Sequence, residues 1–259
     1  MSAKLFRIIL IVALLALAAL PVFCQSPAPS YISVARYQVK MDRATECRDL
    51  MKQIAEFYKK AAPADQYSIV YSSTVGNAFE YWVYSPMNKF ADRDGASPLT
   101  KITKPEERAA LYPRFLQYME HVQGSIMRPI NDLSVIASGA KFPPTFINAF
   151  RISVRPGKEN DFISIAKADL VPAIKKINGS VFLVQQTVAG GNPSVFLAYT
   201  GFEKWAELDD TATFLNAMGG EQAVQKFGEK MSQVAAVSEH FMLRYEPDLS
   251  YIPAAPAQK

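Results

Sequence analysis

The sequence predicts an α+β protein in which one β-α-β-β-α-β unit occurs twice. Residues 36–94 align without a gap to residues 151–209, at a constant offset of 115 positions, and about one aligned position in six is identical. Identical pairs, such as Tyr84 with Tyr199, fall at expected strands, turns and helix starts. A period of this length is too long for a solenoid repeat, so the natural unit is one small domain present in two copies.

Length and composition agree with two such units. A chain of 259 residues corresponds to about two domains, and 49% of the residues are apolar, so each unit can build a core. Acidic and basic residues are interspersed, and the formal net charge is +4. No basic stripe indicates a nucleic-acid partner.

Each unit opens with a strand whose side chains alternate in polarity. Residues 33–40 place Tyr37 on an apolar face and Arg36 on the opposite face, and residues 150–155 repeat this pattern around Arg151. The remaining elements are expected in the same order in both units: first helices at 43–62 and 158–177, hairpins of 67–74 with 79–85 and of 181–188 with 195–200, second helices at about 105–127 and 219–234, and closing strands at 133–137 and 240–245.

The second helices align less directly than the rest of the units. Residues 115–122 match residues 227–234 at an offset of 112, through Phe115, Met119 and Val122 of the first unit. This register predicts a three-residue insertion in the first unit.

This order of elements is the ferredoxin-like split βαβ arrangement. Its four-stranded sheet has both helices on one side, so the other face is bare, and a second copy is the obvious cover. We therefore expect two tandem ferredoxin-like units packed sheet to sheet as an intrachain pseudo-dimeric α/β barrel. The expected division is a signal peptide at 1–24, a disordered N-terminus at 25–30, unit 1 at 31–137, a linker at 138–144, unit 2 at 145–246 and a Pro-rich tail at 247–259.

The first residues have the pattern of a secretory signal. Lys4 and Arg7 precede an uninterrupted apolar stretch at 8–20, and a polar segment follows Cys24. Cleavage after Cys24 predicts a secreted or periplasmic protein with no stable membrane association. Two alternatives remain open: a lipid anchor on Cys24, which the bulky Phe23 disfavours, and an uncleaved anchor.

Cleavage would leave Cys47 as the one cysteine, so no internal disulfide is expected. Cys47 lies in a helical pattern and is interpreted as a small buried hydrophobe rather than a reactive thiol. Loss of Lys4 and Arg7 would lower the formal charge from +4 to +2.

Over residues 31–246, the duplicated order of elements resembles the dimeric α/β-barrel superfamily. That superfamily includes antibiotic-biosynthesis-type monooxygenases, chlorite-dismutase-like haem proteins and proteins similar to NIPSNAP. The resemblance is at the level of the fold, which does not fix function. Because both units are in one chain, it implies a monomer with pseudo-two-fold symmetry or a weak homo-oligomer.

Histidines are scarce and do not form a metal site in the sequence. His121 is expected in the second helix of the first unit, and His240 at the start of the last strand. No cluster of His, Asp or Glu has ligand spacing, so we expect no metal and no cofactor. Because haem-binding barrel proteins commonly use a histidine on a helix as the axial ligand, His121 is the one haem candidate.

The paired arginines Arg36 and Arg151 are the main site candidates. An arginine between the two sheets needs carboxylate or tyrosine partners, because an unpaired buried charge is costly. One interpretation is a polar patch that orients an anionic or phenolic ligand; the other is a set of structural hydrogen bonds or an exposed strand edge. The expected ligand-binding residues are Arg36, Arg151, Glu80, Tyr84, Tyr199, His240 and Arg244.

Two functions remain compatible with the sequence. The first is non-catalytic binding of a small apolar or aromatic molecule, or of a partner protein. The alternative is a cofactor-independent monooxygenase that acts on an aromatic substrate in a pocket between sheet and helices, because such an enzyme needs little beyond positioning and a proton relay. A roomy pocket favours a ligand function, whereas a barrel filled by side chains favours a structural or interaction role.

Overall fold

The fold is seen in a computed structural model that describes residues 29–95, 100–101 and 103–253. The predicted signal peptide at 1–24, residues 25–28 of the predicted disordered N-terminus and residues 254–259 of the tail lie outside the described residues. The first half of the barrel contains β1 (Tyr31–Val39), α2 (Ala44–Ala61), β2 (Ile69–Val75), β3 (Glu80–Met87), α4 (Pro105–Tyr118), β4 (Met119–Pro129) and β5 (Val135–Ile136). The second half contains β6 (Phe146–Val154), α5 (Glu159–Ile165), a π-helical turn (Ala166–Leu170), α6 (Val171–Ile174), β7 (Val181–Ala189), β8 (Val195–Phe202), α7 (Thr211–Met218), α8 (Glu221–Val234) and β9 (Ala235–Tyr245).

Eight antiparallel strands close into a barrel. The strand order is β4-β1-β3-β2-β9-β6-β8-β7, and a further pairing of β4 with β7 joins the two ends. Two seams hold the halves together: Tyr71 of β2 pairs with Tyr245 of β9, and Met127 of β4 pairs with Thr187 of β7. The short strand β5 extends the edge of β7 beyond this closure.

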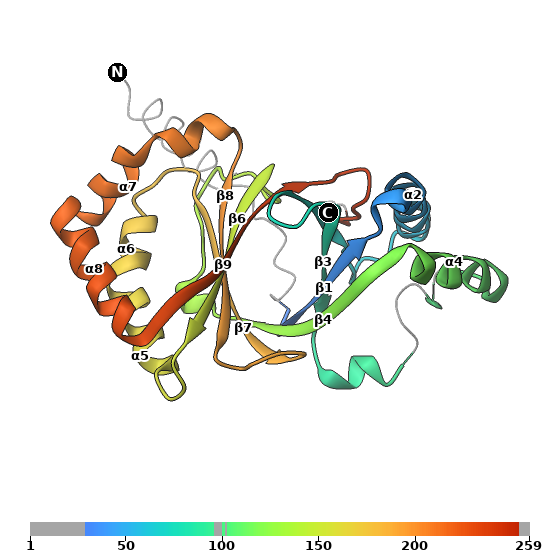
Figure 1. Cartoon of the computed structure of the whole chain (residues 1–259), viewed down its shortest axis with the longest axis horizontal. Coiled ribbons are helices and arrows are strands. Elements are labelled where there is room, and N and C mark those ends of the chain that lie inside the picture. Colours follow the sequence, from blue (N-terminus) through green and yellow to red (C-terminus); the bar gives the residue numbers. More distant parts are fainter. Residues whose placement is uncertain (1–28, 96–99, 102, 254–259) are drawn as a thin grey trace, which may run out of the picture. The chain divides into compact units, whose positions relative to one another are not determined.

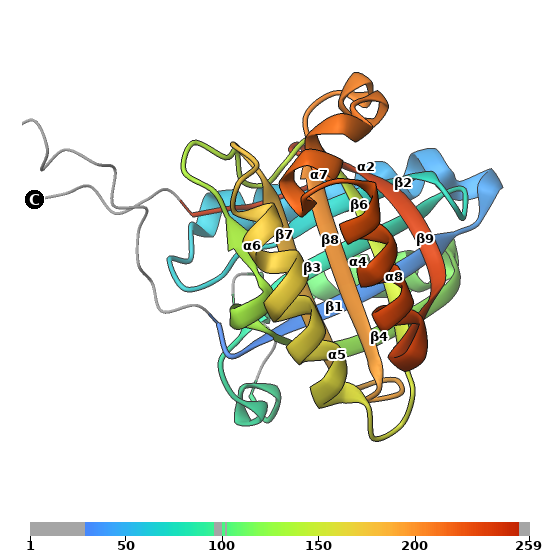
Figure 2. The ribbon, with the colours of Figure 1, turned by 90° about the vertical axis from the view of Figure 1, so that its left-hand side faces the viewer.

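The helices cover the outside of the barrel in two groups. Figure 1 shows α2 and α4 beside the strands of the first half, and α5, α6, α7 and α8 beside those of the second half. Figure 2 shows the second group from the front, with α6 and α8 lying across β7, β8 and β9. In the part of the chain that the structure describes, every helix is too short or too polar to span a bilayer.

Alternation of side chains along each strand divides the core into three clusters. Inside the barrel lies a cluster that includes Val34, Trp82, Tyr84, Tyr199 and Leu243. The other two lie between strands and helices, and we call them the first and second outer layers. The first outer layer includes Val39, Cys47, Met51, Val70, Tyr81 and Met119. The second outer layer includes Val154, Phe162, Ala166, Ile174, Phe182, Phe196 and Val234.

The predicted second helix of the first half was too long. The helix ends at Tyr118, and Met119–Pro129 form β4 between β1 and β7. Met119, Val122 and Ile126 have helical spacing, but pairing with two neighbouring strands determines the conformation of this segment.

The expected closing strand at 133–137 and the offset of 112 were therefore also wrong. Residues 131–133 form a 3₁₀ turn, and only Val135–Ile136 are extended, at the edge of β7. The closing strands begin at Met119 and Ala235 and have 11 residues each, which corresponds to an offset of 116.

Candidate functional site

The second outer layer encloses a cavity of about 460 Å³, which we call the apolar cavity. It lies between the strands β6, β7, β8 and β9 and the helices of the second half. Figure 2 shows these helices and strands from the helix side. Its lining residues are Leu133, Phe150, Ile152, Phe162, Ala166, Leu170, Ile174, Phe182, Val184, Ala198, Thr200, Phe214, Phe227, Met231, Ala235, Ala236 and Val237.

Small side chains and an irregular helix leave this space open. Ala166 on the helix side and Ala198 on the strand side carry only a methyl group where the two surfaces meet. The helix that starts at Glu159 changes to a π-helical turn at Ala166–Leu170, and both ends of that turn line the cavity. Single π-turns of this kind are frequent at functional sites.

The chemistry of the apolar cavity is almost entirely hydrocarbon. Thr200 provides its one hydroxyl group, and none of the lining residues is titratable. An apolar wall with very few polar groups is typical of a binding site for a small molecule. The lining does not fit a haem, because it offers no imidazole, thiolate or phenolate as an axial ligand, only the thioether of Met231.

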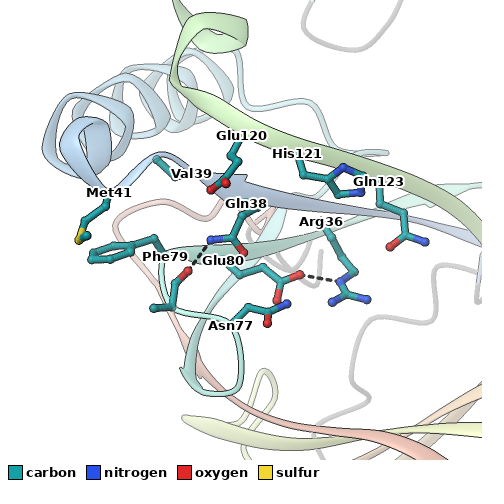
Figure 3. A pocket seen from close by; sticks show the side chains of 11 residues that line it. Arg36, Gln38, Val39, Met41, Asn77, Phe79, Glu80, Glu120, His121 and Gln123 are labelled. Atoms are coloured by element: carbon teal, nitrogen blue, oxygen red, sulfur yellow. Dashed lines mark hydrogen bonds and ion pairs between the residues drawn. The ribbon is translucent and has the colours of Figure 1, made fainter.

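A second, polar pocket of about 670 Å³ lies at one end of the barrel, and we call it the polar mouth. Figure 3 shows its side chains, which come from β1, β3 and β4, from the 3₁₀ turn that follows β1 (Met41–Arg43) and from the turn that joins β2 to β3. The lining residues are Arg36, Gln38, Val39, Met41, Asn77, Ala78, Phe79, Glu80, Glu120, His121 and Gln123. A separate pocket of about 30 Å³ is lined by Arg36, Trp82 and Arg151, among others, next to the buried aromatic side chains inside the barrel.

Arg36 is held firmly at the base of the polar mouth. Its Nε donates a hydrogen bond of 2.7 Å to Oε1 of Glu80 (Figure 3), and the Glu80 side chain is only 4% exposed. The guanidinium carbon lies 4.5 Å from the ring centre of Trp82 and 4.9 Å from that of Phe241. The positive charge of Arg36 is therefore stabilised both by an ion pair and by cation–π contacts.

Arg151 lies in the same interior but is bound more loosely. Its Nη1 is 3.9 Å from Oε1 of Glu239, whose Oε2 is 3.8 Å from Nη1 of Arg36. Glu239 thus lies between the two arginines. The sequence prediction missed Glu239 because Val237 and Ser238 disturb the alternation of β9, where a bulge shifts the register.

Tyr84 and Tyr199 meet deeper in the barrel. Their ring centres are 5.9 Å apart in an edge-to-face arrangement. Burial raises the pKa of both hydroxyls, and the positive charge of Arg36 lowers it to a smaller extent. Both phenols are therefore neutral at physiological pH and serve as core residues.

His240 and Arg244 do not join this group, contrary to expectation, because they lie on the outer face of β9. The ring of His240 stacks on Phe150 at 4.5 Å between centroids. Arg244 donates a hydrogen bond of 3.0 Å to Oε1 of Glu246. Since Glu239 and Phe241 point inward, the alternation of β9 turns their neighbours outward.

His121 lies on β4 rather than on a helix, so the expectation of a helical axial ligand for haem was wrong. It faces the polar mouth next to Gln123 (Figure 3). Among the described residues, no group of three or more His, Cys, Asp or Glu side chains could hold a metal ion.

Comparisons with known proteins identify the fold. No protein-family model and no curated protein matches the chain. It is similar to an anthrone oxidase-like protein (TM-score 0.59, 10% identity, 90% of this chain and 98% of the other). It is also similar to a monooxygenase-like protein from Lactobacillus acidophilus NCFM, with a TM-score of 0.58 and 10% identity over 87% of this chain and 97% of the other. A chlorite dismutase mutant from Candidatus Nitrospira defluvii matches with a TM-score of 0.52 and 6% identity over 85% of this chain and 92% of the other.

These structures define a class of fold and not an activity. The likeness extends to the fold of this chain, a closed barrel of eight antiparallel strands with helices on its outside.

Proposed function

We propose that this protein binds a small apolar or aromatic molecule in the apolar cavity, without transforming it. The observation that carries the proposal is the lining of that cavity, in which Thr200 is the one polar side chain. A hydrocarbon wall gains free energy from every apolar surface that it removes from water, about 25 cal/mol per Å². Thr200 can orient a ligand through one hydrogen bond.

A binding experiment with pyrene, an uncharged aromatic fluorophore, tests this proposal. The mature protein is expected to bind one pyrene, with an emission change on titration. Ala198→Leu adds three carbon atoms inside the cavity, where they obstruct a planar ligand, and is expected to abolish the signal, whereas Ala109→Leu on the exposed face of α4 leaves it unchanged. Equal pyrene binding by both variants would refute a site in this cavity.

A cofactor-independent monooxygenase is the second candidate. Its support is the position of the apolar cavity between sheet and helices, together with the names of the neighbours, which are oxidase-like and monooxygenase-like. The missing titratable side chain in the lining weighs against it, because such an enzyme needs a proton relay. Oxygen uptake with a panel of quinol-type aromatics discriminates the two: turnover that Ala198→Leu eliminates would establish the enzyme.

We also infer that the two halves are tandem ferredoxin-like copies, at 31–137 and 145–246, and that the chain is exported. The orders β4-β1-β3-β2 and β9-β6-β8-β7 support the first inference, since each strand occupies the same place in its half. The apolar stretch at 8–20 supports the second. Mass spectrometry of the protein from its own cells would give the mature N-terminus, any lipid on Cys24 and any ligand that co-purifies.

A further inference from the structure

Two buried glutamates at the ends of the barrel differ in how their carboxylates are satisfied. The side chains of Glu80 and Glu246 are each 4% exposed. Glu246 accepts hydrogen bonds from Ser72 and Arg244 on Oε1 and from Arg48 on Oε2. Glu80 accepts from Arg36 on Oε1, but its Oε2 has no hydrogen-bond partner among the described residues. An acceptor that is shielded from water and lacks a donor is costly.

This oxygen belongs to a residue that lines the polar mouth, so a donor group on a molecule bound there would satisfy it. The charge of the pocket favours a cationic donor. Its lining contains one guanidinium, that of Arg36, and two carboxylates, those of Glu80 and Glu120. Arg36 is already paired with Glu80 and approached by Glu239, so an incoming anion would find little uncompensated positive charge.

The rim of the pocket adds an apolar surface. Phe79 is 43% exposed and Met41 is 74% exposed. Phe79 also has a φ of +56°, which is unusual for a residue with a large side chain and common at functional sites. Figure 3 shows both side chains on the same side of the pocket, across from His121 and Gln123. An exposed ring beside two carboxylates is suited to a cation with an attached hydrocarbon group.

We propose that the polar mouth is a second binding site, separate from the apolar cavity, for an organic ammonium ion with an aromatic or aliphatic substituent. A rotation of the Glu80 side chain brings Oε2 to the surface of the pocket, where the ammonium group donates to it and is attracted by Glu120. Its substituent packs on Phe79 and Met41. The side-chain amides of Gln38, Asn77 and Gln123 supply acceptors for the remaining N–H groups.

Isothermal titration of the mature protein with benzylammonium, benzyl alcohol and benzoate tests the proposal. Benzylammonium is expected to bind at least tenfold more tightly than benzyl alcohol, because a hydrogen bond to a charged group is stronger than a neutral one. Benzoate is expected not to bind. Added salt weakens binding of the ammonium ion at this partly open site. Equal affinities for the amine and the alcohol, or preferential binding of benzoate, would overturn the proposal.

Variants locate the site. Glu80→Gln is expected to reduce the affinity for benzylammonium at least tenfold, and Glu120→Gln and Phe79→Gly each about two- to fivefold. Glu56→Gln, an exposed carboxylate on α2, is the matched control and leaves the affinity unchanged. Ala198→Leu in the apolar cavity also leaves the affinity for benzylammonium unchanged. The proposals for the two sites can therefore be refuted independently of each other.

A measurement on the wild-type protein covers the case in which Glu80→Gln does not fold. Backbone amide resonances of residues 77–80 and 121–123 are expected to shift on addition of benzylammonium. Shifts confined to any other region would place the amine elsewhere and overturn the proposal.

Discussion

In the first half of the barrel, aromatic and sulfur-containing side chains occupy the layer between strands and helices, whereas in the second half this layer encloses about 460 Å³ of space. Tyr37 and Phe115 meet edge to face in the first outer layer, with ring centres 4.9 Å apart. At the corresponding places, 115 and 116 residues later, Ile152 and Met231 line the apolar cavity.

At other corresponding positions, too, the first half has the larger side chain and the second half the smaller one. Met51 of the first outer layer corresponds to Ala166, and Val83 corresponds to Ala198. Two exchanges compensate in part, since Cys47 corresponds to Phe162 and Ala35 to Phe150. The same set of strands and helices is therefore a packed core in one half and encloses a cavity in the other, because the volumes of a few side chains decide between the two.

The two arginines differ between the halves as well. Arg36 has Glu80 as a close partner, but the residue that corresponds to Glu80 in the second half is Val195. Arg151 consequently relies on Glu239, at 3.9 Å. The polar mouth is therefore built mainly by the first half, and the apolar cavity by the second.

The largest effect on the free energy of unfolding is expected when the two interior arginines are replaced one at a time. Arg36→Met leaves Glu80 as a buried charge without a cation, which costs about 3–5 kcal/mol of unfolding free energy. Arg151→Met breaks a long contact to a half-exposed carboxylate and costs less than about 1 kcal/mol. Urea unfolding at pH 7 measures both. Equal losses would contradict the asymmetry between the arginines.

The next largest effect on stability is expected when side chains are exchanged between the two outer layers. Met51→Ala creates a hole in the first outer layer and is expected to destabilise the protein by about 2–5 kcal/mol. Ala166→Met puts the larger side chain into existing space, so it changes stability by less than about 1 kcal/mol and eliminates pyrene binding. Thermal unfolding and fluorescence titration measure these outcomes. A large loss of stability in Ala166→Met would mean that the apolar cavity cannot accept added atoms.

The acid stability of the protein is expected to depend on Glu246, which ties β9 to α2 through Arg48. Burial alone would raise the pKa of this carboxyl, but hydrogen bonds from Ser72, Arg48 and Arg244 lower it below the usual 4.5. A lowered folded-state pKa stabilises the protein above pH 4.5, and this contribution disappears as the pH falls through the folded-state value.

Glu246→Gln is therefore expected to cost about 1–3 kcal/mol at pH 7 and to make stability less dependent on pH below 4.5. Urea unfolding between pH 3 and pH 7 measures the slope. Glu56→Gln is the control and should keep the wild-type slope. An unchanged slope in Glu246→Gln would exclude this carboxyl as the source.

The smallest effect concerns Cys47, the counterpart of Phe162. Burial raises the pKa of its thiol to about 11, and the side chain is fully buried. In a Cys24→Ser background, Ellman's reagent at pH 7.5 is expected to leave the folded protein unmodified and to react once the protein is unfolded in urea. Rapid labelling of the folded protein would show that the first outer layer opens more easily than its packing indicates.

The local features of this protein can be predicted from the amino-acid sequence. Alternation around Arg36 and Arg151 placed both on the face opposite the helices, and the interior of the barrel is where they lie. The offset of 115 gave the order of strands and helices in both halves. These features depend on the period of a short segment, which a strand or helix imposes locally.

Three features depend on tertiary contacts: the residue at which β4 begins, the pairing of β4 with β7 that closes the barrel, and the half that contains the apolar cavity. It also placed Glu239 between the arginines and turned His240 and Arg244 outward. Strand pairing, bulges and cavity volume depend on side chains more than 50 residues apart in sequence, and contacts between such distant residues leave no periodic pattern in either segment.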